Sequence, residues 1–297
     1  MHIAGEAVCL LTALLWAVAV AMFRRPVLEH GARTTNLAKC LLGALLQGFT
    51  VLALGQSAVL WTSSSQALLL LAASGLVGLS MGDTALFVAV ARIGVHRTLL
   101  LQTLSPVFAA SIAFVWQDEL PARTAMLGAM VILTGVALVV GPRRGQSAVR
   151  DPTHLISGVL LGALAALGQG SGVVLAKAGM AEVPVMPASF VRLLAGAAGL
   201  ALLAGISGGF HGLGRLIVSP VMRSRVLPAT LLGTYLALFL MMTGIALAPA
   251  AIAATLLSVA PVFGLFIDTF VHRQPLTPRD LVGTLLAVAG VAVLTHG

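Results

Sequence analysis

Ten apolar runs, separated by short polar links, constrain this chain more than any other feature of its sequence. Each run is close to the ~20 residues that a helix needs to cross the hydrocarbon core of a bilayer. A backbone in hydrocarbon must satisfy its own hydrogen bonds, so each run is predicted to be a helix. The runs are Val8–Phe23, Leu37–Leu54, Ala67–Ala91, Thr98–Trp116, Thr124–Val140, Leu155–Ala178, Pro187–Ile206, Val226–Leu247, Ala251–Val271 and Arg279–Thr295.

The composition agrees with this interpretation. Of the 297 residues, 59% are hydrophobic and 9% are charged, whereas a soluble domain carries about 25% charged residues. So few charges do not cover a water-facing surface, and the polar links are too short for a separate soluble domain. We therefore expect an all-α membrane protein of ten transmembrane helices, with the lipid bilayer as its solvent.

The second half of the chain repeats the first. A gapless shift of 155 positions brings Pro106 onto Pro261, Gly128 onto Gly283 and Gly135 onto Gly290. Matched prolines and glycines at one spacing indicate duplication of a helical unit. We divide the chain into a first five-helix repeat at 1–141, a linker at 142–154 and a second five-helix repeat at 155–297, because glycine, proline and arginine interrupt the apolar pattern at the linker.

An odd number of helices in each repeat has a geometric consequence. The second repeat must enter the membrane from the side opposite to the first, so the two are inverted repeats related by an axis in the membrane plane. Such a chain opens its centre to either side when its halves exchange conformations. This alternating access favours a secondary transporter of a small-molecule substrate over a passive anchor.

The basic residues are distributed unevenly among the links. Fourteen of the seventeen Lys and Arg residues, Lys39 among them, lie in or beside the links after the first, third, fifth, seventh and ninth runs. The positive-inside rule places those links in the cytoplasm. We therefore expect a multi-pass protein of the cell inner (plasma) membrane with both termini outside the cytoplasm. Lys177 and Arg192 are expected to extend towards a membrane interface.

The paired hairpins resemble the EamA domain of the drug/metabolite transporter superfamily. Leu104–Phe108, Asp118–Leu120 and the glycines at 128 and 135 carry the resemblance in the first half, and the segment Val259–Phe263 carries it in the second. The resemblance covers nearly the whole chain and implies a ten-helix carrier of small metabolites. Two departures stand out: the family's acidic residue after the fourth helix is Glu119 in the first half but Gln274 in the second, and ten-helix members usually keep both termini in the cytoplasm.

Asp83 is the strongest single candidate for function, since it lies inside the third apolar run. A carboxylate at bilayer depth costs roughly 2.5–3.5 kcal/mol on insertion scales unless it is neutral, paired or facing water. One interpretation is a site for proton coupling or cation binding. The alternative is a structural aspartate that is bonded to neighbouring polar groups. Asp268, in the ninth run, is expected to form a surface ion pair with His272 or Arg273.

Other polar residues within the runs are candidates for a central substrate or proton pathway. Their alternative role is helix packing. Pro106 and Pro261 are expected inside the fourth and ninth helices, where a proline kinks the helix and can act as a hinge. The remaining pathway candidates are Trp16, Gln102, Ser105, Gln169, Tyr235, Thr255 and Ser258.

Rival functions have less support. The sequence contains no HExxH, P-loop or GxSxG pattern and no metal-ligand cluster, so we expect neither an enzyme nor a cofactor or metal. Its basic residues form no aromatic-rich stripe of the kind that binds nucleic acid. A lipid-linked substrate flippase, or a subunit of one, remains the alternative function, while a channel fits inverted repeats less well. Protons are a candidate coupling ion, and the chain is expected to be a monomer or homodimer.

Overall fold

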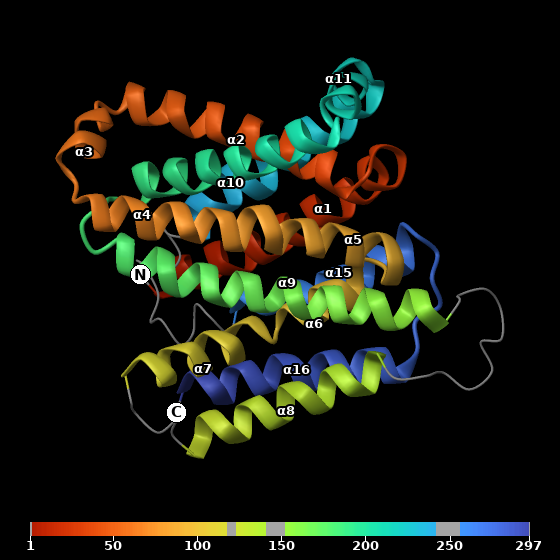
Figure 1. The fold of residues 1–297 in the computed structure, drawn as a ribbon. Helices are drawn as coiled ribbons and strands as arrows, with labels where there is room; N and C mark the ends of the chain where they lie inside the picture. The colour runs from red at the N-terminus through yellow and green to blue at the C-terminus, as the bar shows by residue number, and fades with distance from the viewer. Residues whose placement is uncertain (1, 118–122, 141–151, 242–255, 297) are drawn as a thin grey trace.

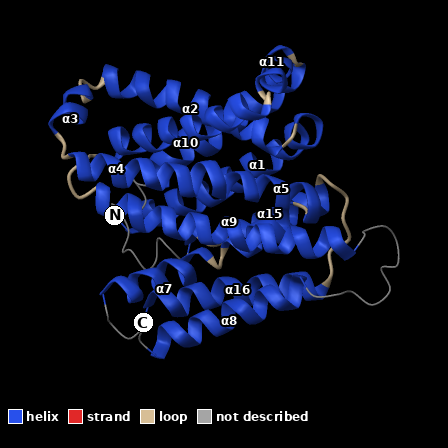
Figure 2. Ribbon diagram, in the orientation of Figure 1, coloured by secondary structure: helices blue, strands red, loops and turns tan. Residues whose placement is uncertain are grey.

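The computed structural model describes residues 2–117, 123–140, 152–241 and 256–296. Within these ranges every regular element is a helix (Figure 2). The helices form a stack that runs from α2 at one side to the α8 and α16 pair at the other (Figure 1). The expected all-helical fold is therefore present in the described part of the chain.

The described helices of the first half follow the expected runs closely. The third run is built from three consecutive segments, α4, the π-helical η1 and α5. The elements are α1 (His2–His30), α2 (Ala32–Ala53), α3 (Ser57–Thr62), α4 (Ser65–Ser74), η1 (Gly75–Gly82), α5 (Asp83–Ile93), α6 (Val95–Gln102), α7 (Ser105–Gln117) and α8 (Arg123–Val140).

The described helices of the second half also follow the expected runs. A short surface helix, α11, occupies the basic link after the seventh run. The elements are α9 (Pro152–Gly179), α10 (Val185–Ser207), α11 (Phe210–Val218), η2 (Met222–Val226), α12 (Leu227–Ala229), η3 (Thr230–Leu236), α15 (Ala260–Phe270) and α16 (Pro278–His296).

Eight helical stretches in the described ranges are long and apolar enough to span a membrane. They correspond to eight of the ten expected runs. The other two are the fourth run, which is divided into α6 and α7, and the ninth run, in which the described part begins just before the 11-residue α15.

The prolines in these two runs differ from expectation. Pro106 and Pro261 were predicted inside continuous helices, and this placement is wrong. Each is the second residue of a new helix, α7 or α15, after a two-residue turn. A proline in the first turn removes no intrahelical hydrogen bond, because the amide there has no partner in the helix. The chain therefore breaks before each proline at matched positions.

Helices from the two halves pack in matching pairs. α8 lies against α16, and α2 lies against α10, so two helices of the first half contact their own equivalents. α5 and η1 pack on α9 as η3 packs on α1, and α7 packs on α9 as α15 packs on α1. Exchanging the halves leaves this pattern unchanged, as expected for two units related by a two-fold axis.

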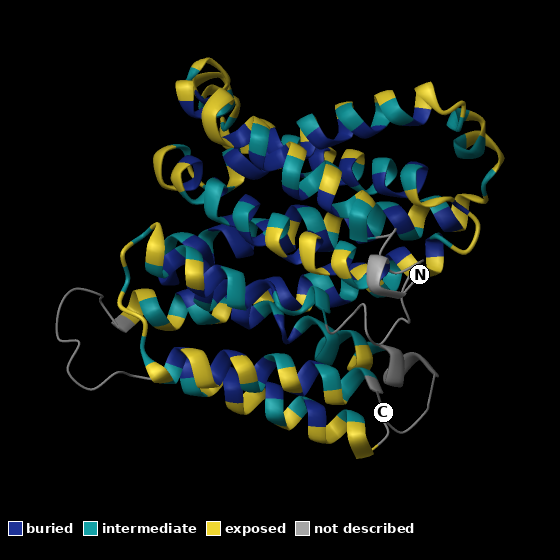
Figure 3. Ribbon diagram, turned by 180° about the vertical axis from the view of Figure 1, so that it is seen from behind, coloured by how far each residue is buried: buried dark blue, intermediate teal, exposed yellow. Residues whose placement is uncertain are grey.

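The outer surface is largely apolar. Exposed positions recur along the outer sides of the helices (Figure 3), and many are large hydrophobic residues, such as Leu45, Phe49 and Leu160. A water-soluble protein rarely exposes so continuous an apolar surface. This surface suits the hydrocarbon of a membrane.

The basic links gather at one end of the molecule. The turns from α1 to α2, from α5 to α6 and from α15 to α16 lie there, with α11, whereas α1 begins and α16 ends towards the opposite end (Figure 1). The sequence analysis grouped Lys39 with these links, and the structure corrects this placement. Lys39 is buried within α2. Without Lys39, the Lys and Arg residues are still distributed unevenly among the links.

Candidate functional site: a central cavity

A cavity of about 320 Å³ lies between the two halves of the chain. Its described walls come from nine helical elements and from residues on either side of 242–255. The elements are α1, α2, η1, α5, α6, α7, α9, α10 and η3. Most of its surface is apolar, and the polar groups are few. The polar wall residues are Thr12, Lys39, Asp83, Gln102, Ser105, Gln169, Ser189, Arg192 and Thr234.

Glycines allow the helices around the cavity to approach one another closely. A methyl group at Gly168 of α9 would lie 3.0 Å from Cα of Gly82, and one at Gly172 would lie 3.1 Å from Cα of Gly78. A side chain at these positions would separate α9 from η1. Because η1 ends at Gly82, this contact places Asp83, the first residue of α5, beside α9.

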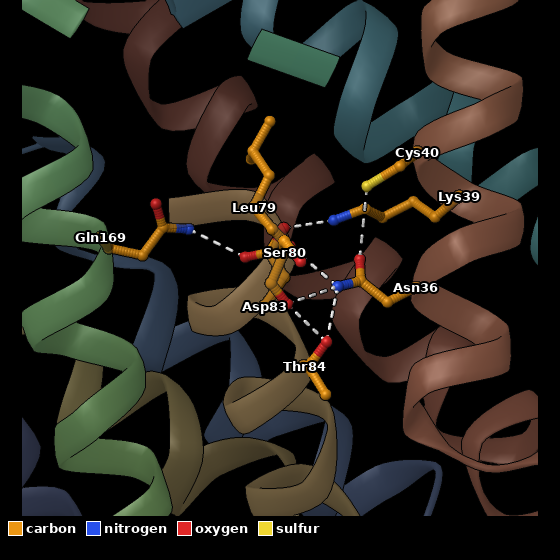
Figure 4. A network of polar contacts seen from close by, with 8 residues as sticks. All are labelled: Asn36, Lys39, Cys40, Leu79, Ser80, Asp83, Thr84 and Gln169. Atoms are coloured by element: carbon orange, nitrogen blue, oxygen red, sulfur yellow. Dashed lines mark hydrogen bonds and ion pairs between the residues drawn. The ribbon is translucent and has the colours of Figure 1, made fainter. Parts of the chain in front are cut away.

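Asp83 lies at the centre of a buried polar network (Figure 4). One carboxylate oxygen, Oδ2, forms an ion pair with Lys39 Nζ from α2. The other, Oδ1, accepts a hydrogen bond of 3.0 Å from Gln169 Nε2 of α9. Asp83 is 2% exposed and Lys39 3% exposed, so the pair is removed from bulk water and each charge depends on the other.

Asn36 holds α2 in register with the Asp83 segment. Its side-chain amide donates to the Leu79 carbonyl oxygen at 2.8 Å and to Thr84 Oγ1 at 2.9 Å (Figure 4). It lies about one helical turn before Lys39 on the same helix. The ammonium group of Lys39 also lies 5.5 Å from the ring centre of Phe87, within the range of a cation–π contact. These contacts fix where the Lys39 ammonium group can lie.

Arg192 borders the same cavity from α10. The expectation that it extends to a membrane interface is wrong, because its Nε is buried and has no hydrogen-bond partner among the described residues. Its guanidinium group lies near Gly78 of η1. Lys177, in contrast, is exposed at the end of α9.

Five of the residues singled out in the sequence line the cavity together. They are Trp16, Asp83, Gln102, Ser105 and Gln169. Gln102 and Ser105 were expected to share one helical face. They instead flank the break between α6 and α7, yet both reach the same wall.

The remaining candidates lie elsewhere. Tyr235 is on η3, but its hydroxyl group is 2.8 Å from Thr50 Oγ1 of α2 and is not part of the described wall. Ser258 lies in the turn before α15, next to the wall residue Leu257. Thr255 lies outside the described residues.

Sequence reasoning missed the two cations of the cavity. Lys39 and Arg192 are single basic residues within apolar runs, and such residues are functional candidates by the same argument that selected Asp83. A second signal was also present: Lys39 and Gly43 are spaced as Arg192 and Gly196 are, four residues apart in corresponding helices. Both cations are therefore at equivalent positions of the duplicated unit.

A second polar cluster surrounds Asp268 near the end of α15. The expected contact with His272 is present, with His272 Nδ1 2.7 Å from Asp268 Oδ1. It is not a surface pair, since Asp268 is 4% exposed and its Oδ2 also accepts a hydrogen bond of 2.9 Å from the His96 backbone amide. His96 Nδ1 is in turn 3.1 Å from the Pro261 carbonyl oxygen. The cluster therefore joins α6 to α15.

The cavity has the groups needed to bind a small molecule. It offers an ion pair, a guanidinium group and several hydroxyl and amide groups within apolar walls, the usual composition of a small-molecule site. Across the described ranges, no three His, Cys, Asp or Glu side chains come together as metal ligands. The chemistry available here is recognition of a polar group within an apolar site.

The fold and the cavity together define a multi-pass membrane protein with a binding site between its halves. The EamA-like transporter family matches residues 3–141 and 156–296, and the chain belongs to this family. Its members are transporters rather than enzymes, so the protein is a membrane transporter of the drug/metabolite transporter superfamily.

Other comparisons agree on the fold alone. No curated protein is significantly similar to the chain in sequence. A crystal structure, described only as that of a protein, matches with a TM-score of 0.62 and 18% identity over 99% of this chain and 96% of its own length. At that identity the match shows a shared fold and carries no information about substrate.

Proposed function

We propose that the protein is a secondary transporter that moves a small amphipathic metabolite across the inner membrane by alternating access. The observation that carries this proposal is the central cavity, whose walls come from both halves of the chain. A site between two similar halves is accessible from either side in turn when the halves rock against each other.

The proposed architecture has ten membrane spans in two inverted repeats, at 1–141 and 155–297, with a linker between them. The helices of the two halves pack in matching pairs, which supports this arrangement. In each repeat the fourth helix breaks before a proline, at Pro106 or Pro261. These breaks are the proposed hinges, since a two-residue turn between helices bends more easily than a continuous helix.

The Lys39–Asp83 ion pair is the proposed coupling element. Protonation of Asp83 removes the charge that compensates Lys39, so the pair has two states that differ by one proton. Gln169 donates to Asp83 from the other half of the chain. Loss of the charge on Asp83 therefore weakens a contact between the halves, which links the proton to their relative movement.

Transport by the purified protein in liposomes tests this function. A panel of amino acids, aromatic acids, amines and neutral amphiphiles is supplied with and without an imposed pH gradient. We expect uptake of at least one compound to respond to the gradient in the wild type and to lose that response in Asp83→Asn. Uptake that responds equally in Asp83→Asn would contradict coupling through this residue.

The same liposomes separate a metabolite carrier from the alternative, a flippase for lipid-linked substrates. A carrier moves water-soluble compounds into the lumen, whereas a flippase moves a labelled lipid between leaflets. Exchange of the lipid without movement of any soluble compound would replace the proposed function by the alternative.

A further inference from the structure

The two cations of the cavity are equivalent residues in the two halves of the chain. Lys39 is the eighth residue of α2, and Arg192 is the eighth residue of α10. The two helices pack against each other reciprocally: a methyl group at Gly43 would meet Leu193, and one at Gly196 would meet Cys40. Each cation therefore enters the cavity from the same place in its own repeat.

The carboxylate that balances Lys39 has no counterpart in the second half. Asp83 follows Gly82 directly after η1, whereas Thr234 follows Gly233 within η3. Both Asp83 and Thr234 line the cavity, but only Asp83 carries a charge. The described walls thus contain two cations and one carboxylate, and one positive charge remains in excess.

Arg192 bears this excess charge. Its Nε is buried without a partner among the described residues, while Lys39 is compensated by Asp83. Asp83 attracts the Arg192 guanidinium group electrostatically, but its two carboxylate oxygens already accept from Lys39 and Gln169. A buried N–H group that is left without an acceptor is costly. A protein retains such a group where a ligand supplies the missing acceptor, and Arg is well suited to a carboxylate because its planar fork binds two oxygens at once.

A second unpaired donor lies on the same cavity. Gln102 Nε2 is also buried and without a partner among the described residues. An amide N–H and a guanidinium group both donate hydrogen bonds, and neither accepts one. The two orphaned donors therefore favour a ligand that presents acceptor oxygens over one that presents an ammonium group.

We infer that the cavity binds the carboxylate of a small amphipathic monoanion, with Arg192 as its main contact and Gln102 as a second donor. This inference rests on the proposed function and assigns the class of its substrate. One excess positive charge matches a monoanion better than a dianionic phosphate ester. The apolar body of the ligand fits the rest of the wall, where Trp16, Leu193 and Met241 lie.

Binding of four matched probes to the purified full-length protein tests the inference. The probes share one phenyl group and differ in their head group: phenylacetate, phenylacetamide, phenethylamine and phenyl phosphate. Affinity is measured by isothermal titration at neutral pH and checked by ligand-induced shifts in thermal unfolding. We expect phenylacetate to bind most tightly of the four.

Three variants separate the role of Arg192 from a general effect of charge. Arg192→Gln is expected to weaken phenylacetate binding by roughly 10- to 100-fold, as loss of a hydrogen bond to a charged group requires. Arg192→Lys keeps the charge but not the fork and is expected to lose less. The control is Arg215→Gln, on the exposed α11, and its affinity is expected to match the wild type.

A folding defect is distinguishable from loss of the contact. Since Arg192 Nε has no acceptor in the part of the chain that the structure describes, Arg192→Gln should unfold at or above the wild-type temperature in the absence of probe. Lower affinity in a variant of undiminished stability supports the inference. A marked fall in stability without probe, together with equal affinity for phenylacetate and phenylacetamide in the wild type, would assign Arg192 a structural role and overturn it.

The remaining outcomes of the binding experiment also either support or overturn the inference. Preference for phenethylamine, tighter binding of phenyl phosphate, or no phenylacetate binding at millimolar concentration each overturns the inference and leaves the proposed transport function intact. Phenylacetate binding that requires Arg192, without transport of any compound in liposomes, supports the inference and contradicts the proposed function.

Discussion

Gly128 of α8 and Gly290 of α16 face each other across a backbone contact that admits no side chain. A methyl group on Gly128 would lie 2.7 Å from the Gly290 carbonyl oxygen, and one on Gly290 would lie 2.9 Å from the Gly128 carbonyl oxygen. Gly135 and Gly283 form a similar contact, at 2.5 and 2.8 Å. The two pairs run in opposite order along the chain, so α8 and α16 are antiparallel, and each helix uses the same two glycine positions of the repeat.

Alanine at Gly128 should destabilise the protein. The added methyl group would collide with backbone atoms of α16, which cannot rotate away, and overpacking of this kind typically costs about 1–3 kcal/mol. Thermal unfolding in detergent, followed by light scattering or circular dichroism, measures the effect. Gly214→Ala is the control, because nothing lies within 4 Å of a methyl group there, and alanine in an open helical position is stabilising by up to ~1 kcal/mol. Equal stability of the two variants would contradict the close contact.

The Lys39–Asp83 pair should show strong coupling in a double-mutant cycle. Removal of one member of a buried pair leaves an uncompensated charge, which costs about 3–5 kcal/mol. We therefore expect Lys39→Gln and Asp83→Asn each to lower the unfolding temperature, and the double variant to be more stable than the sum of the two losses predicts. Additive losses would mean that the two side chains do not depend on each other.

The Asp268 cluster should depend more on its backbone hydrogen bond than on its ion pair. Asp268→Ala leaves the buried His96 amide without an acceptor, at a cost of about 1–3 kcal/mol. His272→Ala removes only the histidine, whose side chain is 20% exposed, and exposed ion pairs contribute about 0–1 kcal/mol. Unfolding temperatures of the two variants compare these costs. A larger loss in His272→Ala would reverse this ranking.

The positions of the termini can be tested with reporters. The basic links at one end of the stack predict that this end faces the cytoplasm and that Gly297 lies outside it. Alkaline phosphatase fused after Gly297 should be active, and green fluorescent protein fused there should be dark. Fusions within the basic link near Arg215 are the matched control and should give the reverse result. Fluorescence of the Gly297 fusion would contradict the proposed orientation and place Gly297 in the cytoplasm.

Much of the fold could be predicted from the sequence, because bilayer thickness sets the length of an apolar helix and gapless repetition reveals duplication. Eight of the ten runs appear as helices able to span a membrane. The break before Pro106 could not be predicted, since a proline is compatible with a kink inside a helix and with the start of a new one. Only the surrounding contacts decide between them.

For the candidate site, the sequence by itself determined which residues are costly in a membrane: it singled out Asp83 through its charge inside an apolar run. Only the tertiary structure decided what compensates each charge. Asp83 contacts Lys39, 44 positions away, and Gln169, 86 positions away, whereas Arg192 Nε has no acceptor among the described residues. Helices that are apolar on all sides carry no periodic signal for their rotation about their own axes. The direction in which Arg192 or Tyr235 points is therefore set by the packing of neighbouring helices and not by local sequence.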